Sequence, residues 1–447
     1  MFKTLLNFFR KSDAVSFLED EENRNKKFKK LRLSVFSSIT IGYSLFYVCR
    51  LSINVVKSSI ISEGLLNESE LGIVGSALFF SYAAGRFTNG FLADRSNIKR
   101  FMSTGLFVSA IINLLFGFTS VFIVFAILWG FNGWFQSMGA APSVVGLSRW
   151  FKNNERGTYY GVWSTSHSVG KAITYILISF IVSLFGWRFG FAGAAIIGFV
   201  GVIILLKFLY DTPESEGLFP VTEIQSCENE TAGKSKSVST LQLGVLKNPY
   251  VWILAFASAF MYISRYAIES WGIFYLETSK GYSNLEASSL LSISAITGII
   301  STMLCGYISD KYFRGSRNIP ALFFGLLNVL SLWLFLFLPN SNNLIDIISI
   351  ALFGFATGSL ITYLGGLMAI DIVSKKVSGA AIGVVGIASY IGAGLQDAIS
   401  GNLIGKYHVV FNGVSSYDFT YVKYFWLGAA ALSLVLTLFV WNAKVEE

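Results

Sequence analysis

The chain has 447 residues, of which 53% are apolar and only 13% are charged, and its mean hydropathy is +0.60. Since a soluble domain carries about 25% charged residues, this composition indicates a protein embedded in lipid along its whole length. The apolar runs reach membrane-spanning length, which excludes the short alternating strands of an outer-membrane barrel. Three scattered cysteines and only two histidines predict no disulfide framework, no metal site and no cofactor.

The net charge of +8 does not indicate nucleic-acid binding, because the basic residues lie between the apolar runs. Many of them fall within the first 32 residues, before the first long apolar run begins. We therefore predict that residues 1–32 form a cytoplasmic arm rather than a cleaved signal peptide.

About twelve helical spans follow in chain order, which predicts an all-α membrane protein. We expect them near 33–57, 69–93, 101–118, 120–149, 158–185, 188–210, 250–278, 284–309, 319–338, 344–373, 379–406 and 421–442. The predicted organisation is a six-helix bundle over 33–210, a polar cytoplasmic linker over 211–248, a second six-helix bundle over 249–442 and a cytoplasmic tail over 443–447.

Lysine and arginine residues predict the orientation of the chain in the membrane. Connections on the side of the N-terminus hold Arg95, Lys99, Arg100, Lys152, Arg156, Lys311, Arg314, Arg317, Lys375 and Lys376. We assign to the opposite connections little more than Lys57, Arg188, Lys280, Lys406 and Lys423. By the positive-inside rule, both termini and the linker are cytoplasmic.

The two predicted bundles repeat each other in sequence. Gly90-Phe-Leu-Ala-Asp94-Arg95 recurs as Gly306-Tyr-Ile-Ser-Asp310-Lys311, and Arg50 of the first span matches Arg265 of the seventh at nearly the same offset. A duplication of this kind is typical of transporters that bind their substrate between the halves near the middle of the membrane.

Arg50 and Arg265 are charges inside predicted spans, where each costs about 2.5–3.5 kcal/mol to insert. Helical spacing places each arginine on a face with other polar residues. These faces hold Tyr43, Tyr47 and Arg50 in the first span, and Tyr262, Arg265 and Glu269 in the seventh. Guanidinium groups bind phosphate bidentately and tyrosine hydroxyls can donate to its remaining oxygens, so the faces together predict an oxyanion pocket. Pairing of Arg265 with Glu269 in the empty state is a competing interpretation.

Three residues at a spacing of four in the fifth span, Trp163, His167 and Lys171, also share a face. His167 can donate a hydrogen bond to a phosphate oxygen or can be a packing residue. Lys171 is either a further anion ligand or the partner of an acid such as Glu269 or Asp397, and the sequence does not separate these alternatives.

Two further spans carry candidate substrate ligands. Arg86 in the second span either faces the cavity or extends to the cytoplasmic boundary. In the eleventh span, Tyr390 and Asp397 lie on one face. Asp397 either pairs with a cavity cation, contacts a sugar hydroxyl, or makes a hydrogen bond that packs helices together.

The repeated charged loops lie at cytoplasmic ends of spans. We predict a gating role for their charges, which are Asp94, Arg95, Asp310 and Lys311. Ion pairs among such groups can hold one access state closed. The alternative is that they only set the topology.

Several motifs resemble the organophosphate:phosphate antiporter branch of the major facilitator superfamily, which includes glycerol-3-phosphate and hexose-6-phosphate transporters and a hexose-phosphate sensor. The resemblance extends from about Gly42 to the last span. Its motifs are Gly42-Tyr-Ser-Leu-Phe-Tyr-Val-Cys-Arg50, Ala93-Asp-Arg-Ser-Asn97, Asn132-Gly-Trp-Phe-Gln-Ser-Met-Gly139, Asn154-Glu-Arg-Gly157, Trp163 to His167, Asp211-Thr-Pro213, and Tyr262-Ile-Ser-Arg-Tyr266 with Trp271.

The resemblance implies a major facilitator fold and rocker-switch exchange of an organophosphate for inorganic phosphate without ATP, in the bacterial inner membrane. It makes Arg50 and Arg265 the phosphate-binding pair, with Tyr43, Tyr47, Tyr262 and His167 around them. The chain departs from the family pattern at Lys171, where the family has glycine, and at Ser270, where it commonly has an acid. The resemblance therefore supports the phosphate group of the substrate more strongly than the identity of its organic part.

Three other function classes compete with the antiporter. A receptor for sugar phosphate acting through a partner kinase fits the motifs about as well, and uptake into liposomes would distinguish the two. A proton-coupled carrier of a neutral sugar ranks lower, because the cavity is expected to be cationic. An enzyme ranks lowest, since no nucleophile–base set or metal site is visible.

Overall fold

A computed structural model describes residues 7–17, 20–221, 244–313, 317–338, 343–373, 378–411 and 414–441. Most of the predicted linker, residues 222–243, and the predicted tail lie outside these ranges. Every structural statement below refers to the described residues.

The first half of the chain forms six membrane-spanning segments. Their helices are α2 (Glu21–Ser62), α3 (Glu68–Arg95), α4 (Ile98–Phe116), α5 (Phe122–Trp150), the composite α6 (Asn153–Ser164), α7 (Ser166–Ile173), η1 (Thr174–Ile178) and α8 (Ser179–Phe185), and α9 (Trp187–Phe208). The fifth span is thus one helix interrupted by a π-helical turn, η1. A short 3₁₀ turn, η2 (Glu214–Glu216), follows the last span.

The second half repeats this arrangement. Its elements are α11 (Pro249–Lys280), α12 (Asn284–Tyr312), α13 (Asn318–Phe337), the composite α14 (Asn343–Thr362), η3 (Tyr363–Leu367) and α15 (Met368–Asp371), α16 (Ser378–Lys406), the hairpin β1 (His408–Phe411) and β2 (Val414–Tyr417), and α17 (Thr420–Phe439). Ten described helices are long and apolar enough to cross a membrane, and α3 and α5, with 28 and 29 residues, supply the other two spans. The prediction of about twelve helices is confirmed.

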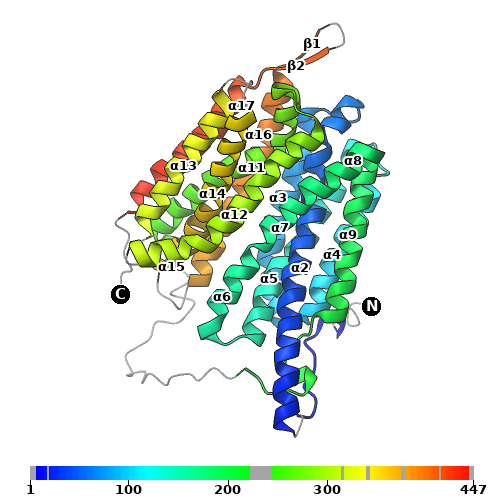
Figure 1. The fold of residues 1–447 in the computed structure, drawn as a ribbon, viewed down its shortest axis with the longest axis vertical. Helices are drawn as coiled ribbons and strands as arrows, with labels where there is room; N and C mark the ends of the chain where they lie inside the picture. Colours follow the sequence, from blue (N-terminus) through cyan, green and yellow to red (C-terminus); the bar gives the residue numbers. More distant parts are fainter. Residues whose placement is uncertain are drawn as a thin grey trace.

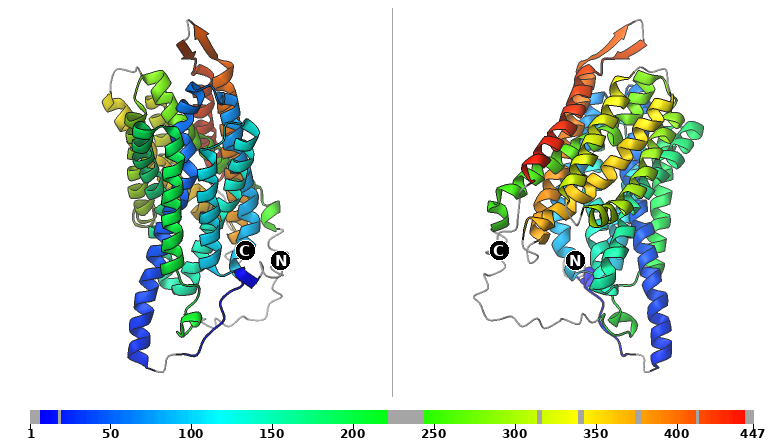
Figure 2. Two further views of the ribbon diagram at one scale, coloured as in Figure 1. Left: turned by 90° about the vertical axis from the view of Figure 1, so that its right-hand side faces the viewer. Right: turned by 60° about the vertical axis from the view of Figure 1, so that its left-hand side comes forward.

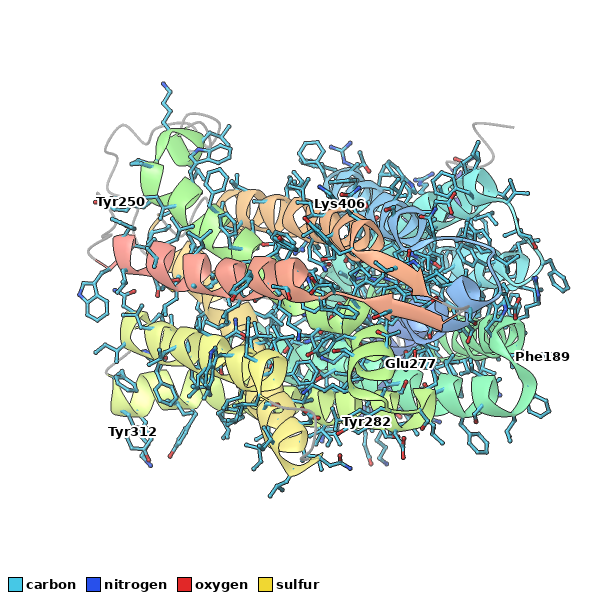
Figure 3. The ribbon with its side chains drawn as sticks, turned by 90° about the horizontal axis from the view of Figure 1, so that it is seen from above. Phe189, Tyr250, Glu277, Tyr282, Tyr312 and Lys406 are labelled. Carbon is cyan, nitrogen blue, oxygen red and sulfur yellow. The ribbon has the colours of Figure 1, made fainter. Side chains whose placement is uncertain are left out.

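The two halves stand side by side as separate helix groups (Figure 1). We call the end that carries the strands β1 and β2 the hairpin end, and the end where α2 begins the linker end; Figure 2 shows that they are opposite ends of the molecule. A view onto the hairpin end shows the two groups meeting along the helices that contact each other across the interface (Figure 3). These contacts join α3 to α16, α2 to α11 and α7 to α12.

Local sequence signals explain where several helices begin and end. Asn67 and Glu70 form a capping box at the start of α3, and Ser283 and Glu286 form the corresponding box at the start of α12. Each box satisfies backbone N–H groups that would otherwise lack partners. Gly281 ends α11 with φ of 75°, a left-handed conformation that glycine adopts without strain.

The linker end of the first half is held by a buried carboxylate, Asp211, which is 3% exposed. Arg149 of α5 donates to it at 2.5 Å, and the backbone N–H of Ile98 at the start of α4 donates at 3.0 Å. Ser12 of the predicted N-terminal arm donates its backbone N–H at 2.8 Å. The described part of the arm is therefore packed onto the bundle, and α2 itself begins inside the predicted arm, at Glu21.

Glycines bring α3 and α16 into direct contact across the interface between the halves. A Cβ atom added to Gly72 would lie 2.6 Å from the carbonyl oxygen of Asp397, and one added to Gly401 would lie 2.4 Å from that of Glu68. At Gly75, a Cβ would lie 1.8 Å from Asp397 Oδ2. Small residues permit this close approach in a membrane, where helices associate by packing rather than by the hydrophobic effect.

Replacing Gly75 by alanine is therefore expected to destabilise the protein by about 1–3 kcal/mol, the usual cost of an extra methyl group in a packed interior. Gly90→Ala is the matched control, because Gly90 lies on the same helix and an added Cβ would meet no atom within 4 Å. Both variants gain the same helix propensity. A lower Tm in detergent for Gly75→Ala alone is the expected result, and equal Tm values would contradict the packing argument.

Candidate substrate-binding site

Arg50 lies well inside α2 and is only 2% exposed. None of its three side-chain nitrogens has a hydrogen-bond partner among the described residues. Its guanidinium group is held over the rings of Tyr82, at 4.1 Å, and Tyr47, at 4.7 Å. Such cation–π contacts contribute roughly 0.5–2 kcal/mol each, but they leave every N–H donor of a buried cation unused. An arrangement of this kind is suited to an anionic ligand.

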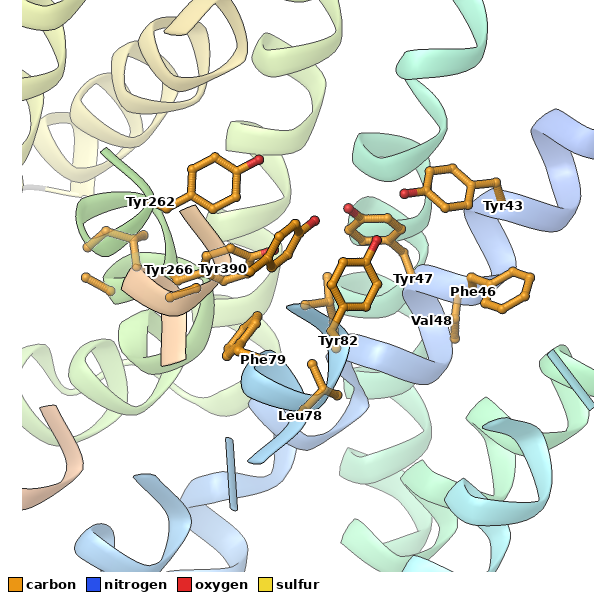
Figure 4. Close-up of a cluster of buried hydrophobic side chains, with 14 of the residues drawn as sticks. Tyr43, Phe46, Tyr47, Val48, Leu78, Phe79, Tyr82, Tyr262, Tyr266 and Tyr390 are labelled. Carbon is orange, nitrogen blue, oxygen red and sulfur yellow. The ribbon is translucent and has the colours of Figure 1, made fainter. Parts of the chain in front are cut away.

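Tyrosines connect Arg50 to Arg265 of α11 across the interface between the halves. The ring of Tyr82 packs on that of Tyr390 at 4.4 Å, and Tyr390 contacts Tyr262 at 5.5 Å. The guanidinium of Arg265 in turn lies 5.5 Å from the ring of Tyr262. Figure 4 shows the hydroxyl groups of Tyr43, Tyr47, Tyr82, Tyr262 and Tyr390 pointing toward one central region. The two arginines are thus buried, do not face lipid, and belong to one cluster between the halves.

Arg265 is not free in this structure. Its Nε donates to Glu269 Oε1 at 3.0 Å, as their spacing of four on one helix permits. Lys171 of α7 donates to the same oxygen, also at 3.0 Å. All three side chains are at most 7% exposed. The sequence left open whether Lys171 binds an anion or pairs with Glu269 or Asp397, and in this structure it pairs with Glu269.

Asp397 of α16 also has a cationic partner, and that partner corrects a sequence-based assignment. The sequence predicts Lys57 in a connection, but it lies inside α2, is 1% exposed and contacts Asp397 Oδ1 at 3.2 Å. Asp397 Oδ1 additionally accepts from Ser270 Oγ at 2.7 Å and from Trp271 Nε1 at 2.6 Å. The assignment is wrong because Lys57 is near the end of a long apolar run, where the sequence does not show whether the helix continues or a loop begins. Its position seven residues after Arg50, on the same helix face, was the signal that could have identified it.

His167 and Arg86 lie toward the linker end from these ion pairs and are partly exposed. His167 Nδ1 donates to the backbone oxygen of Ser164 at 2.5 Å, which leaves Nε2 available. The His167 ring is 5.8 Å from that of Tyr47, and the guanidinium of Arg86 is 5.6 Å from the ring of Tyr390. Both residues therefore border the cluster on its linker-end side.

Hydrogen bonds and ion pairs between described residues of the two halves gather on the hairpin-end side of Arg50 and Arg265. Besides the two ion pairs, Tyr175 Oη donates to the Glu269 carbonyl at 3.0 Å and Asn284 Nδ2 donates to the Val55 carbonyl at 2.9 Å. At the hairpin itself, Tyr417 Oη donates to Glu68 Oε1 at 2.8 Å. These contacts join the two halves at the hairpin end.

The predicted gating residues lie at the linker end. Asp94 and Arg95 are exposed, and the Asp94 carbonyl accepts from Arg149 at 3.0 Å. Lys311 is exposed and donates to Tyr307 Oη at 2.5 Å. The side chain of Asp310 lies outside the described part of the structure.

The family model described as Major Facilitator Superfamily matches residues 39–396. The chain belongs to this superfamily. Among solved structures of the same fold is a bacterial homolog of the human lysosomal transporter Spinster in an inward-facing, occupied conformation, which aligns with a TM-score of 0.70 over 92% of this chain and 96% of that one, at 17% identity.

Relatives within the superfamily match nearly the whole chain. The "Probable hexose phosphate transport protein" of Chlamydia pneumoniae is 32% identical over 98% of both chains. The glycerol-3-phosphate transporter of Bacillus subtilis is 34% identical over 90% of this chain and 93% of its own, and the membrane sensor protein UhpC of Salmonella typhimurium is 32% identical over 88% and 90%. The motifs around Arg50 and Arg265 had predicted this branch of the superfamily, and the prediction is confirmed.

The structure adds to the cluster three residues that the sequence did not identify as candidate substrate ligands. Tyr82 and Tyr266 lie under the two arginines, since the guanidinium of Arg265 is 5.0 Å from the Tyr266 ring. Trp163 stacks on Tyr43 at 5.0 Å, and neither its indole nitrogen nor the Tyr266 hydroxyl has a described hydrogen-bond partner. The chain has 20 tyrosines, and only the fold distinguishes the tyrosines of the cluster from those elsewhere.

Proposed function

We propose that this superfamily member is a secondary antiporter that exchanges an organophosphate, either a sugar phosphate or glycerol 3-phosphate, for inorganic phosphate. The observation that carries the proposal is Arg50, a buried cation whose N–H donors have no described partner and which shares a tyrosine cluster with Arg265 of the other half. The substrates in the names of the relatives, hexose phosphate and glycerol 3-phosphate, support the choice of phosphate esters.

A phosphate group fits the chemistry of this cluster. Two guanidinium groups can each donate two parallel hydrogen bonds to phosphate oxygens, and the converging tyrosine hydroxyls can donate to the rest. On the linker-end side, the Nε2 atom of His167 would offer a further hydrogen bond to the phosphate, and Arg86 would add a further positive charge. The polar hydroxyl lining would suit the hydroxyl groups of a sugar or glycerol. Lys171 and Asp397 are occupied by their ion pairs with Glu269 and Lys57, so in this proposal they support the site rather than bind the substrate directly.

Transport would proceed by alternating access, with the halves rocking about the cluster. The contacts at the hairpin end support a state open toward the linker end, which the positive-inside rule makes the cytoplasmic side of a bacterial inner membrane. Both termini and the linker would then be cytoplasmic. The charges of Asp94, Arg95, Asp310 and Lys311 would close that end in the opposite state. The gradients of substrate and phosphate supply the driving force, and no enzymatic step is proposed.

A second candidate is a membrane receptor for sugar phosphate that signals through a partner kinase. The chain is as similar in sequence to a membrane sensor protein as to a transport protein, and this similarity supports the receptor as a second candidate. Binding would use the same cluster, so the two candidates differ in whether the bound anion crosses the membrane.

A counterflow screen tests the proposal. The purified chain is placed in liposomes loaded with phosphate, and uptake of radiolabelled glycerol 3-phosphate, hexose 6-phosphates and phosphoglycerates is measured. Uptake of at least one ester in exchange for internal phosphate, with none of unphosphorylated glucose, is expected. Saturable binding of an ester without any exchange would reject the antiporter and favour the receptor.

A further inference from the structure

We propose that the linker end of the first half carries a second anion site, a cavity that binds a small soluble phosphate ester with a flat ring, the class to which nucleotides belong. The cavity has a volume of about 370 Å³. None of the described residues that line it belongs to the tyrosine cluster around Arg50 and Arg265. The site is therefore independent of the exchange function proposed above.

The first turns of α2 form one wall of the cavity. At the linker end this helix projects beyond the other helices of the first half (Figure 1). Arg24, Phe28 and Arg32 follow one another at a spacing of four, so they lie along one face of the helix. All three line the cavity, and this face of α2 therefore presents an aromatic ring between two guanidinium groups.

The end of α5 forms a second wall. Trp150, the last residue of α5, stacks on Phe28 with 6.1 Å between the ring centroids. Its indole nitrogen donates to the Tyr210 carbonyl at 3.2 Å. These contacts fix both aromatic side chains in place, so the wall exists without a ligand.

The chain after η2 closes the cavity on its third side. Gly217 has φ of 73°, a left-handed conformation that suits glycine and ends the 3₁₀ turn. The chain then places the ring of Phe219 at 4.4 Å from the Arg24 guanidinium. Lys27 Nζ donates to the Glu216 carbonyl at 2.7 Å, which ties this segment to α2.

The charge of the cavity favours an anion. Its cations are Arg24, Arg32 and Lys152, and no carboxylate lines it in the described part of the chain. One acid, Glu155, forms an ion pair with Arg32 from outside the lining. Three cations against one acid leave an excess of positive charge. Lys152 also directly precedes α6 and makes no side-chain capping bond, so the partial positive charge of this helix N-terminus adds to the cations.

The shape and lining of the cavity indicate what kind of anion it accepts. Ligand pockets commonly have volumes of about 300–1,000 Å³, so this cavity admits a small organic molecule. Guanidinium groups bind phosphate, and aromatic side chains stack on flat rings. Inorganic phosphate would use only the cations, whereas a nucleotide would also use Phe28, Trp150 and Phe219.

The depth of the cavity favours a soluble ligand over a lipid headgroup. At a rise of about 1.5 Å per residue, Arg32 lies about 27 Å and Arg24 about 39 Å along α2 from Arg50. A bilayer with its headgroup regions extends only about 20–22 Å from its centre. With Arg50 near that centre, the cavity lies beyond the headgroups in the aqueous phase.

Binding of a fluorescent ADP derivative to the full chain in phosphatidylcholine nanodiscs tests the proposal. Saturable binding is expected, with displacement by ADP at concentrations at least about tenfold lower than by inorganic phosphate or adenosine. The double variant Arg24→Gln with Lys152→Gln is expected to bind the probe at least about tenfold more weakly. Lys29→Gln with Lys30→Gln is the matched control, because it removes the same charge from exposed positions of α2 outside the cavity lining and should bind as the native chain does.

A second variant guards against a loss of binding caused by misfolding. Asn25 is exposed and lines the cavity, so Asn25→Trp fills the space without removing a cation. It is expected to weaken probe binding at least about tenfold while the Tm in detergent and the rate of phosphate exchange stay native. Arg50→Lys should do the opposite, lowering exchange and leaving probe binding unchanged.

Three results would overturn the inference. The first is the absence of saturable probe binding to the native chain. The second is native-like binding in both cavity variants, or loss of binding in Arg50→Lys. The third is displacement of the probe by phosphatidylglycerol included in the nanodisc, which would make the ligand a lipid headgroup. Failure of phosphate exchange with probe binding intact would reject the proposed function and leave this site standing.

Discussion

Replacing Arg50 by lysine is expected to lower the affinity for phosphate by about two orders of magnitude, the equivalent of about 3 kcal/mol. An ammonium group keeps the charge but cannot reproduce the planar fork that binds two phosphate oxygens at once. Because Arg50 makes no hydrogen bond to a described residue, the protein itself loses only the contacts with Tyr47 and Tyr82. Arg265→Lys should have a similar effect on binding, but it also disturbs Glu269.

The affinity is measured as the concentration of external phosphate that gives half-maximal exchange, alongside the Tm in detergent. Arg100→Lys is a suitable control, since Arg100 is exposed and donates to the Phe8 carbonyl far from the cluster. Native-like phosphate affinity in Arg50→Lys, with the protein folded, would remove Arg50 from the binding site and with it the main support for the proposed function.

Lys57→Met is expected to produce the largest loss of stability, about 3–5 kcal/mol, because it leaves the carboxylate of Asp397 buried without its cation. The pair is at most 2% exposed, and Lys57 also lies 3.8 Å from the Trp271 ring. Ser270 and Trp271 would still donate to Asp397, but neutral donors do not balance its charge. The double variant with Asp397→Asn removes both charges and should recover most of the loss, as replacement of a whole buried ion pair usually does.

Thermal unfolding in detergent measures this effect through the Tm of the single and double variants. Lys207→Met serves as the control, because Lys207 is exposed in the last turn of α9 and should tolerate the change. If the double variant is as unstable as Lys57→Met, the loss comes from packing and the electrostatic explanation is wrong.

The sequence alone determined the class of fold and the centre of the candidate site. Membrane-spanning helices follow from apolar runs of sufficient length, since lipid leaves the backbone few alternatives to an internally hydrogen-bonded helix. Arg50 and Arg265 were identifiable because a charge in such a run is costly and needs a reason, and because the duplication gives them equivalent places. Spacing also placed Tyr43 and Tyr47 with Arg50, and Glu269 with Arg265.

Only the tertiary structure decided which partner each buried charge takes. Lys171 could have met Asp397 as well as Glu269, and Lys57 was not recognised as buried at all. Pairings between α7 and α11, or between α2 and α16, depend on the rotation and depth of helices from different halves, and helical periodicity fixes positions only within one helix. Where the two halves contact each other also belongs to the tertiary level, because those contacts join side chains on helices that are far apart in the sequence.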